Sequence, residues 1–364
     1  MGPLYGITVV ELAGLGPGPY ACMLLADMGA DVITVDRPAG RSSIALTGGV
    51  VNRGKRSIAL DLKDRASHAA LMALLETADV VIEGYRPGVA ERLGLGPEDV
   101  WARNPRVVYG RMTGWGQDGP LAQSAGHDIG YIALTGALHA MGEAHVAPQI
   151  PLNLVGDFGG GSTFLVMGVL AALLEVQRTG IGQVVDAAIV DGTSHLLSLM
   201  HTMVNAGQWS DQRQANMLDG GYPFYSVYET SDGRHMAVGA LEPQFFAQLV
   251  ELLGVEVGPQ LDRAGWPAMR ATFAARFVER TMAEWTSVFE GTDACVAPVL
   301  TMREAPAHPH VAARGSVLSD DGVLQPGSAP RFSGHVFVPA AAPVVGEHTG
   351  EVLSSLGRPS VVSP

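Results

Sequence analysis

The chain has 364 residues, of which 47% are hydrophobic and 16% charged, so it is long enough for a large core and too apolar to be disordered. Its formal net charge of −13 at pH 7 disfavours nucleic acid as a partner, although a local group of cations can still hold an anionic ligand. Cys22 and Cys295 are too few for a disulfide framework, match no metal-site spacing and fit a reducing, cytoplasmic location.

The first part of the chain alternates short apolar strands with helices. We predict strands at 7–12, 31–35, 57–62, 80–82 and 107–111, and helices at 20–28, 66–76, 87–93 and 97–104. Alternation of this kind is typical of an α/β domain with a doubly wound parallel sheet and helices on both faces.

The middle of the chain continues with a predicted helix at 161–177, a strand at 184–190 and a helix at 194–206. The apolar run at 164–174 is too short to cross a bilayer, and no signal peptide is evident, so we expect no membrane partner. Beyond residue 221 the pattern changes to a hairpin, at 225–229 and 236–240, followed by three helices. We therefore predict a large domain of residues 1–205 and 325–364, a smaller α+β domain of residues 222–312, and linkers at 206–221 and 313–324.

A glycine cluster follows the first predicted strand. Gly14 and Gly16, with Asp36 at the end of the next strand, resemble part of a dinucleotide-binding fingerprint. Pro17 and Pro19, however, lack the backbone N–H groups that a pyrophosphate would need. The cluster therefore favours a tight turn near a site over binding of a nicotinamide dinucleotide.

Three ionisable residues stand among glycines and prolines. His127 lies in GHDIGY, Asp157 in GDFGGG and Glu242 in GALEPQF. Each also has a structural explanation, because lone histidines are usually unreactive and carboxylates often begin helices. An imidazole and two carboxylates in special turns nevertheless indicate acid–base chemistry.

Cations are concentrated at residues 53–56, and Arg37 and Arg86 each follow a predicted strand end. Segment 53–56 is either a solvated loop or a contact for phosphates. Ligands of open α/β sheets bind beyond the carboxyl ends of the strands, which favours the two single arginines as ligand contacts.

Several longer stretches carry a family resemblance. They are VVELAGLGPGPYACMLLADMGADVITVDRP (9–38), IEGYRPGVAERLGLG (82–96), RMTGWGQDGP (111–120), GHDIGY, NLVGDFGGGS (153–162), GQVVDAAIVDG (182–192), ANMLDGG (215–221) and GALEPQF. Together they resemble the class III CoA-transferase (CaiB/BaiF) family, which also contains the α-methylacyl-CoA racemases. The likeness covers almost the whole chain, but segment 39–51 matches no motif of the family.

The resemblance implies an interlocked homodimer of α/β subunits that binds an acyl-CoA thioester between the large domain of one subunit and the small domain of the other. It implies no separate cofactor, because CoA is part of the substrate, and no metal. It further implies CoA contacts at Arg37, Leu60, Asp61, Leu62, Lys63, Gly84, Tyr85, Arg86, Arg92, Gly126, Asp128 and Tyr131.

The family contains two chemistries. Transferases use the aspartate that matches Asp157 as an acyl-accepting nucleophile, whereas racemases also have residues that match His127 and Glu242. Since all three are present, the resemblance implies a racemase that interconverts (R)- and (S)-2-methylacyl-CoA by 1,1-proton transfer through an enolate.

In this interpretation Asp157 serves one face of the substrate and His127, oriented by Glu242 across the dimer interface, serves the other. Backbone N–H groups of 159–161, at the expected start of a helix, would stabilise the enolate. A CoA-transferase that uses Asp157 and a non-catalytic subunit that binds CoA thioesters remain the alternatives. The natural acyl group is open.

Overall fold

The computed structural model describes residues 2–12, 14–38, 49–320, 322–336 and 338–357, so most of segment 39–51 lies outside the described residues. The chain forms two compact units. Unit 1 comprises Met1–Ala137, Pro151–Ser198 and Gln325–Pro364, and unit 2 comprises Leu138–Ile150 and Leu199–Leu324.

The division differs from the sequence-based boundaries mainly at Leu138–Ile150, which the sequence assigned to the large domain. The guanidinium of Arg213 donates hydrogen bonds to the backbone carbonyls of His139, Glu143 and Val146. These bonds connect the segment to residues that follow Leu199, which explains why it groups with unit 2.

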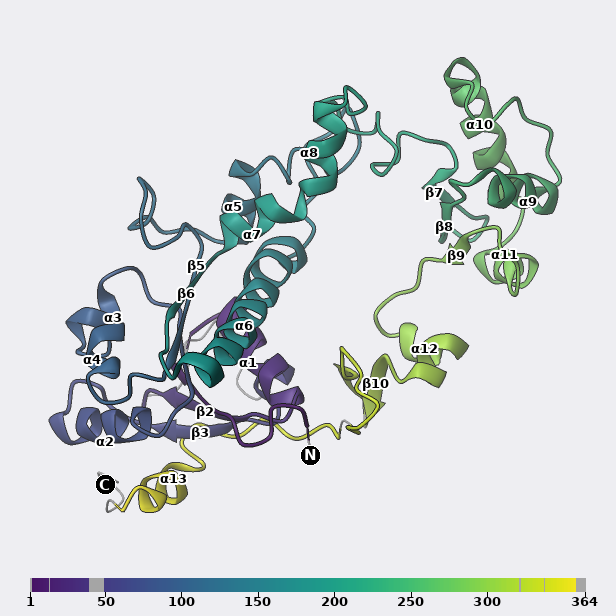
Figure 1. The fold of residues 1–364 in the computed structure, drawn as a ribbon. Coiled ribbons are helices and arrows are strands. Elements are labelled where there is room, and N and C mark those ends of the chain that lie inside the picture. The colour runs from purple at the N-terminus through teal and green to yellow at the C-terminus, as the bar shows by residue number, and fades with distance from the viewer. Residues whose placement is uncertain (1, 13, 39–48, 321, 337, 358–364) are drawn as a thin grey trace. The chain divides into compact units, whose positions relative to one another are not determined.

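A six-stranded parallel sheet forms the centre of unit 1 (Figure 1). Its strands are β1 (Thr8–Leu12), β2 (Asp31–Asp36), β3 (Arg56–Ala59), β4 (Val80–Glu83), β5 (Val108–Thr113) and β6 (Val184–Ala188). They lie in the order β3-β2-β1-β4-β5-β6, with all neighbours parallel. The predicted doubly wound sheet is therefore confirmed, and its winding direction reverses between β1 and β4.

Helices cover both faces of this sheet. One face packs against α1 (Pro17–Asp27) and α6 (Thr163–Thr179). The other packs against α2 (Arg65–Leu75), α4 (Pro97–Trp101) and α13 (Thr349–Ser355). Because side chains alternate along a strand, Val9 enters the first core and Val10 the second. The inner strands β1, β2, β4 and β5 are buried on both sides, which is why their sequences read as short apolar runs.

The glycine-rich segment before α6 is helical, contrary to the sequence-based prediction. Residues Leu154–Ser162 form a π-helix, η2, which continues into α6 as one helix of 26 residues. Gly159–Gly161 therefore lie inside a helix, and the prediction that their N–H groups are free at a helix start is wrong. By length and composition this helix could cross a membrane, but half of its most apolar window is buried in the fold, as in core helices.

Two further predicted elements differ from those in the structure. Strand β6 stops at Ala188, the last residue paired with β5, and α7 (Ile189–Leu196) begins at once. The predicted helix at 194–206 is divided at Leu197, after which α8 (Ser198–Asn205) begins. The other short helices of the unit 1 segments are α3 (Val89–Arg92), α5 (Asp128–Leu134) and η1 (Val50–Asn52).

Unit 2 contains an antiparallel sheet covered by helices. The predicted hairpin is confirmed as β7 (Tyr225–Glu229) and β8 (His235–Gly239), and β9 (Val296–Pro298) adds a third strand. The helices and remaining strands are α9 (Pro243–Leu253), η3 (Arg263–Gly265), α10 (Trp266–Phe277), α11 (Met282–Phe289), η4 (Ala305–Ala307), α12 (Pro309–Arg314), β10 (Val317–Asp320) and β11 (Val323–Pro326). Its core is rich in aromatic residues, among them Phe224, Phe273 and Trp285.

Candidate active site

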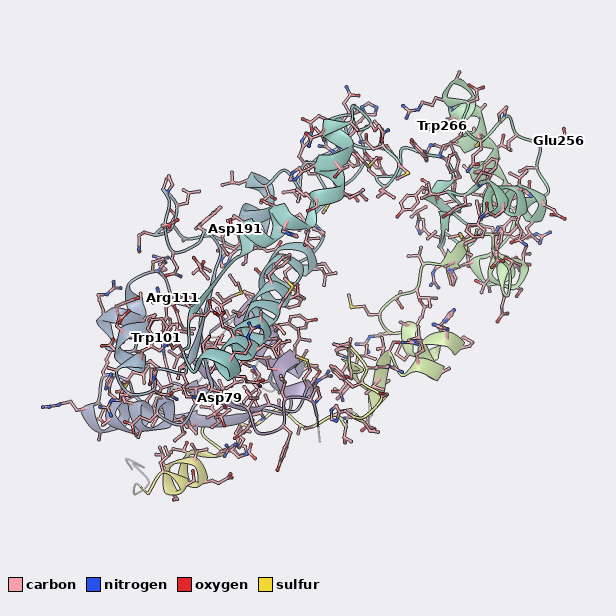
Figure 2. The ribbon with its side chains drawn as sticks, viewed as in Figure 1. Asp79, Trp101, Arg111, Asp191, Glu256 and Trp266 are labelled. Atoms are coloured by element: carbon pink, nitrogen blue, oxygen red, sulfur yellow. The ribbon has the colours of Figure 1, made fainter. Side chains whose placement is uncertain are left out.

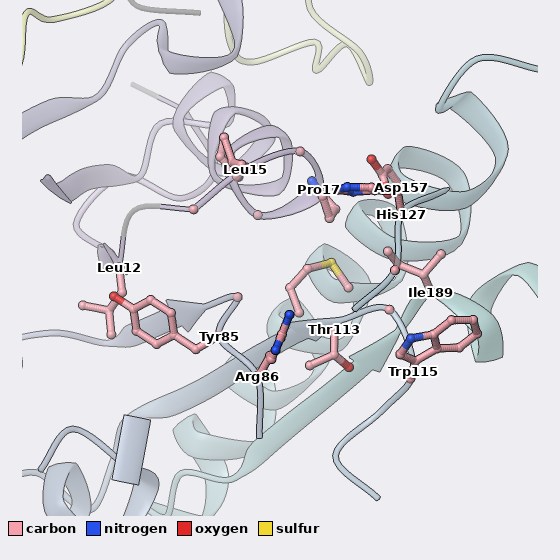
Figure 3. A pocket seen from close by; sticks show the side chains of 18 of the residues that line it. Leu12, Leu15, Pro17, Tyr85, Arg86, Thr113, Trp115, His127, Asp157 and Ile189 are labelled. Atoms are coloured by element: carbon pink, nitrogen blue, oxygen red, sulfur yellow. The ribbon is translucent and has the colours of Figure 1, made fainter. Parts of the chain in front are cut away.

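A cavity of about 880 Å³ opens at the carboxyl ends of the strands of unit 1 (Figure 3). Segments that follow β1, β2, β4, β5 and β6 all contribute to its wall. The crevice therefore lies where the winding of the sheet reverses, which is the usual ligand position in open α/β sheets. Its volume is within the range of small-molecule sites.

Asp157 lies in this cavity, near the start of η2, and its carboxylate is partly buried. Burial raises the pKa of this carboxyl above its ordinary value. A hydrogen bond from Asn153 lowers the pKa, the nearby Asp128 carboxylate raises it, and the His127 imidazole lowers it. An aspartate with a raised pKa is a stronger base and is therefore better suited to take a proton from carbon.

The turn before α1 packs closely against Asp157. Gly16 has a φ of 66°, and a Cβ built on it would lie 3.1 Å from the Asp157 Oδ2. The Ser162 hydroxyl donates to the Pro17 carbonyl at 2.7 Å, and Tyr20 stacks on Phe158 with ring centroids 4.2 Å apart. The glycine–proline turn therefore positions the Asp157 carboxylate, and the sequence-based preference for a tight turn near a site agrees with this geometry.

Asp128 fixes the backbone at Asp157 through a hydrogen bond. Its Oδ2 accepts a hydrogen bond from the Asp157 N–H at 2.6 Å, and the side chain is 8% exposed. A Cβ on Gly156 would lie only 2.3 Å from the same oxygen, so glycine is required there. The family resemblance suggested that Asp128 contacts CoA. In the structure Asp128 instead positions Asp157, which lies 29 residues later in the chain, and no sequence pattern indicates this contact.

His127 precedes α5, and its backbone carbonyl accepts a hydrogen bond from the Tyr131 N–H at 3.3 Å. The Tyr131 ring occupies a slot between Gly114 and Gly126, where an added Cβ would lie 2.0 and 2.5 Å from ring carbons. Trp115 packs edge-on against the same ring, with centroids 4.7 Å apart. The His127 side chain itself is exposed and lines the cavity together with Asp157, as Figure 3 shows.

The cations of segment 53–56 are engaged in internal ion pairs. Arg53 pairs with Asp27 at 2.6 Å and Lys55 with Glu11 at 2.7 Å, and all four side chains are buried. Arg56 binds carboxylates outside the cavity. The hypothesis that this segment contacts phosphates is therefore wrong, because a cation held in a buried pair cannot reach a ligand.

The predicted site residues fall into three groups. Those that line the cavity are Arg37, Gly84, Tyr85, Arg86, Gly126, His127, Tyr131 and Asp157. Those of unit 1 that do not line it are Leu60, Asp61, Leu62, Lys63, Arg92 and Asp128. Glu242 belongs to unit 2, where it is exposed at the start of α9.

The arrangement brings the His127 imidazole, the Asp157 carboxylate and the guanidinium groups of Arg37 and Arg86 to one cavity. The imidazole and carboxylate are able to exchange protons with a carbon acid, and the arginines are able to bind phosphate groups. Within the part of the chain that the structure describes, no three His, Cys, Asp or Glu side chains gather as metal ligands would.

The chain is similar to known proteins over almost its whole length. Residues 4–349 match the family described as CoA-transferase family III. Human α-methylacyl-CoA racemase is 46% identical over 97% of this chain and 93% of its own length, and an acetyl-CoA:oxalate CoA-transferase of Acetobacter aceti is 30% identical over 92% and 90%. The crystal structure of a CAIB/BAIF family protein from Brucella suis is 28% identical, with a TM-score of 0.83 and coverage of 98% and 99%.

Proposed function

Because this chain belongs to CoA-transferase family III, we propose that it is an α-methylacyl-CoA racemase, an isomerase that interconverts (R)- and (S)-2-methylacyl-CoA thioesters. The observation that carries the proposal is the presence of His127 and Asp157 on the wall of one cavity. Racemisation through an enolate requires two proton-transferring groups at one carbon, and this pair supplies them.

The reaction begins when the unprotonated member of the pair removes the proton from C2. The electrons of the C–H bond form a double bond between C1 and C2, and the thioester oxygen takes the negative charge of the enolate. The protonated member then donates its proton to the opposite face of C2, and the carbonyl re-forms. The two groups have now exchanged protonation states, so each enantiomer uses the opposite assignment of acid and base.

Binding of the CoA part would use the cationic wall of the cavity. Arg37 and Arg86 are exposed there and are suited to phosphate oxygens, while Tyr85 and the Gly84 backbone offer contacts for the pantetheine arm. Contacts remote from C2 hold the substrate in position for the proton transfer. No cofactor, nucleic acid or membrane is needed in this reaction, and a cytoplasmic location is supported by the two free cysteines.

We further propose a homodimer in which Glu242 of one subunit orients His127 of the other. Unit 1 exposes large apolar side chains on neighbouring helical segments, a pattern typical of a surface that is covered by a partner. The exposed side chains are Leu134 (66%), Leu154 (57%), Met167 (58%) and Leu174 (62%).

The decisive experiment follows deuterium at C2 of a single enantiomer of a 2-methylacyl-CoA in heavy water. We expect deuterium to enter C2 while the optical purity falls. A substrate that keeps both its C2 proton and its optical purity during prolonged incubation with folded protein would refute the racemase.

The CoA-transferase alternative requires only that the Asp157 carboxylate attack the thioester carbonyl and expel CoA as a thiolate, leaving a mixed anhydride. Asp157 is accessible from the cavity, so hydroxylamine trapping distinguishes the two reactions. A hydroxamate formed at Asp157 during turnover would support the transferase, and an unmodified Asp157 supports the racemase.

A further inference from the structure

A buried carboxylate lies at the base of the turn that follows β4. Glu83 is the last residue of that strand and is only 3% exposed. Its Oε2 accepts a hydrogen bond of 2.6 Å from the backbone N–H of Tyr85. The carboxylate therefore holds the backbone of the turn two residues ahead, although it does not itself line the cavity.

The turn held by Glu83 forms part of the cavity wall. Gly84, Tyr85 and Arg86 all line it, and Figure 3 shows the Tyr85 and Arg86 side chains close to its centre. The charge of Arg37 acts on the Tyr85 phenol and lowers its pKa, against a larger rise caused by burial. A small shift of the Tyr85 backbone would therefore move two side chains that face the ligand.

Charged groups from neighbouring strands and helices surround Glu83. The Nε of Arg111, labelled in Figure 2, lies 3.7 Å from Oε1 and has no hydrogen-bond partner among the described residues. Arg111 also forms an ion pair with Glu91 of α3. Asp186 of β6 and Tyr109 of β5 lie close enough to Glu83 to interact with its charge.

Burial raises the pKa of Glu83 to about 7, and it outweighs the lowering by the Tyr85 N–H and by Arg111. The carboxyl therefore changes charge near neutral pH. The ionised form accepts a stronger hydrogen bond than the neutral form.

We infer that Glu83 is a positioning residue for the ligand site, which fixes the Gly84–Tyr85–Arg86 turn and so strengthens CoA binding when it is ionised. The inference rests on the proposed function, since it assumes that the cavity binds CoA. Among the described residues, the contacts of Glu83 are with the Tyr85 N–H and Arg111 and not with His127 or Asp157, so the inference concerns ligand binding and not proton transfer.

The test measures the dissociation constant of free CoA for the full-length protein at pH 6 and pH 8 by calorimetry. We expect the wild type to bind more tightly at pH 8. Glu83→Ala should raise the dissociation constant at pH 8 about tenfold, which corresponds to ~1.4 kcal/mol for a lost hydrogen bond. Glu83→Gln keeps a neutral acceptor of the same shape, so it should bind CoA at pH 8 less tightly than the wild type but more tightly than Glu83→Ala. Its affinity should change less between pH 6 and pH 8 than that of the wild type, and the change that remains belongs to the CoA phosphates.

Glu91→Gln is the matched control, because it removes the other carboxylate on Arg111 and should change the dissociation constant less than twofold. If the folded wild type binds no CoA, the proposed function fails. If the wild type binds CoA and Glu83→Ala binds equally tightly, or if Glu83→Gln keeps the pH dependence of the wild type, the role of Glu83 is refuted while the proposed function stands. Thermal melting of each variant confirms that it is folded.

Discussion

Two side chains of different chemistry face the same cavity, His127 from the residue before α5 and Asp157 from η2. In the proposed mechanism each of them removes the C2 proton of one enantiomer. Replacing either one should therefore affect proton exchange of the two enantiomers differently. His127→Gln and Asp157→Asn should each lower racemisation by at least about 10³-fold. Each variant should still exchange the C2 proton of one enantiomer, with retention of configuration, and the two variants should retain opposite enantiomers.

The measurement is deuterium incorporation from both pure enantiomers, with chiral analysis of the product. Asp211→Asn is a suitable control, since that side chain is 97% exposed and belongs to unit 2. Full racemisation by either site variant would contradict the two-base mechanism.

Asp128 provides a second prediction at the level of a single residue. Its negative charge raises the pKa of Asp157, so Asp128→Asn should lower that pKa. Because Asp157 acts as a base only when ionised, the acidic limb of the kcat/KM profile should move to lower pH. Asp128→Leu also removes the acceptor for the Asp157 N–H and should lower kcat strongly at every pH. An acidic limb that does not move in a folded, active Asp128→Asn variant would refute this coupling.

Among elements, the π-helix η2 depends on close contact with α7. A Cβ on Gly192 would lie 1.8 Å from the carbonyl oxygen of Gly160, so the two backbones meet without room for a side chain. Gly192→Ala should therefore reduce the free energy of unfolding by about 1–3 kcal/mol or more, as overpacking does. It should also impair activity, since η2 carries Asp157.

Gly350→Ala in α13 is the control, because nothing lies within 4 Å of its added Cβ. Alanine is favoured over glycine in a helix, so this variant should be unchanged or slightly stabilised in a denaturant titration. A Gly192→Ala protein as stable as the wild type would show that η2 and α7 are able to separate at little cost.

The strands and most helices were predictable because short segments of sequence contain the signals that determine them. Buried parallel strands appear as apolar runs, and Pro243 and Gly254 mark the two ends of α9 in the sequence. The π-helix was not predictable, because three adjacent glycines normally indicate a turn and it is the packing against α7 that selects the helix.

His127 and Asp157 were recognisable from their glycine-rich surroundings and the family resemblance, whereas the pairing of Lys55 with Glu11 joins positions that no local pattern connects.

At the scale of the whole molecule, Glu83 links stability to pH. Its folded pKa of about 7 exceeds the ordinary value of 4.5, so the folded state holds this proton more tightly than the unfolded state. The resulting stabilisation is complete below pH 4.5 and is lost as the pH rises through about 7. Glu83→Gln should therefore become more stable than the wild type as the pH increases from 5 to 8, by up to about 3 kcal/mol.

The measurement is urea unfolding of both proteins at several pH values. Glu143→Gln, a change at an exposed carboxylate of unit 2, should leave the pH dependence unaltered. Parallel curves for wild type and Glu83→Gln would show that Glu83 is ionised with an ordinary pKa. If the prediction holds, the carboxylate that strengthens ligand binding also destabilises the free protein at high pH.

The proposed dimer predicts that charges on the exposed apolar surface of unit 1 will separate the subunits. Met167→Glu and Leu174→Glu replace side chains that are 58% and 62% exposed, so neither should disturb the core. Both should shift the protein from dimer to monomer in sedimentation experiments and reduce racemisation. Leu261→Glu, on a 76% exposed side chain of unit 2, is the control. A wild type that sediments as a monomer would refute the dimer.

The last described segment of the chain completes the edge of the large sheet. In the edge strand β3, the Ser57 carbonyl accepts a hydrogen bond from the His348 N–H, and the Ser57 N–H donates to the His348 imidazole Nδ1. The Ala59 N–H donates to the Thr349 hydroxyl oxygen. His348 follows Ser57 by 291 residues in the chain, so during synthesis β3 has one side unprotected until residues 348 and 349 have been made. A chain that stops before residue 346 would leave that side open to other strands, which makes such a fragment prone to aggregation.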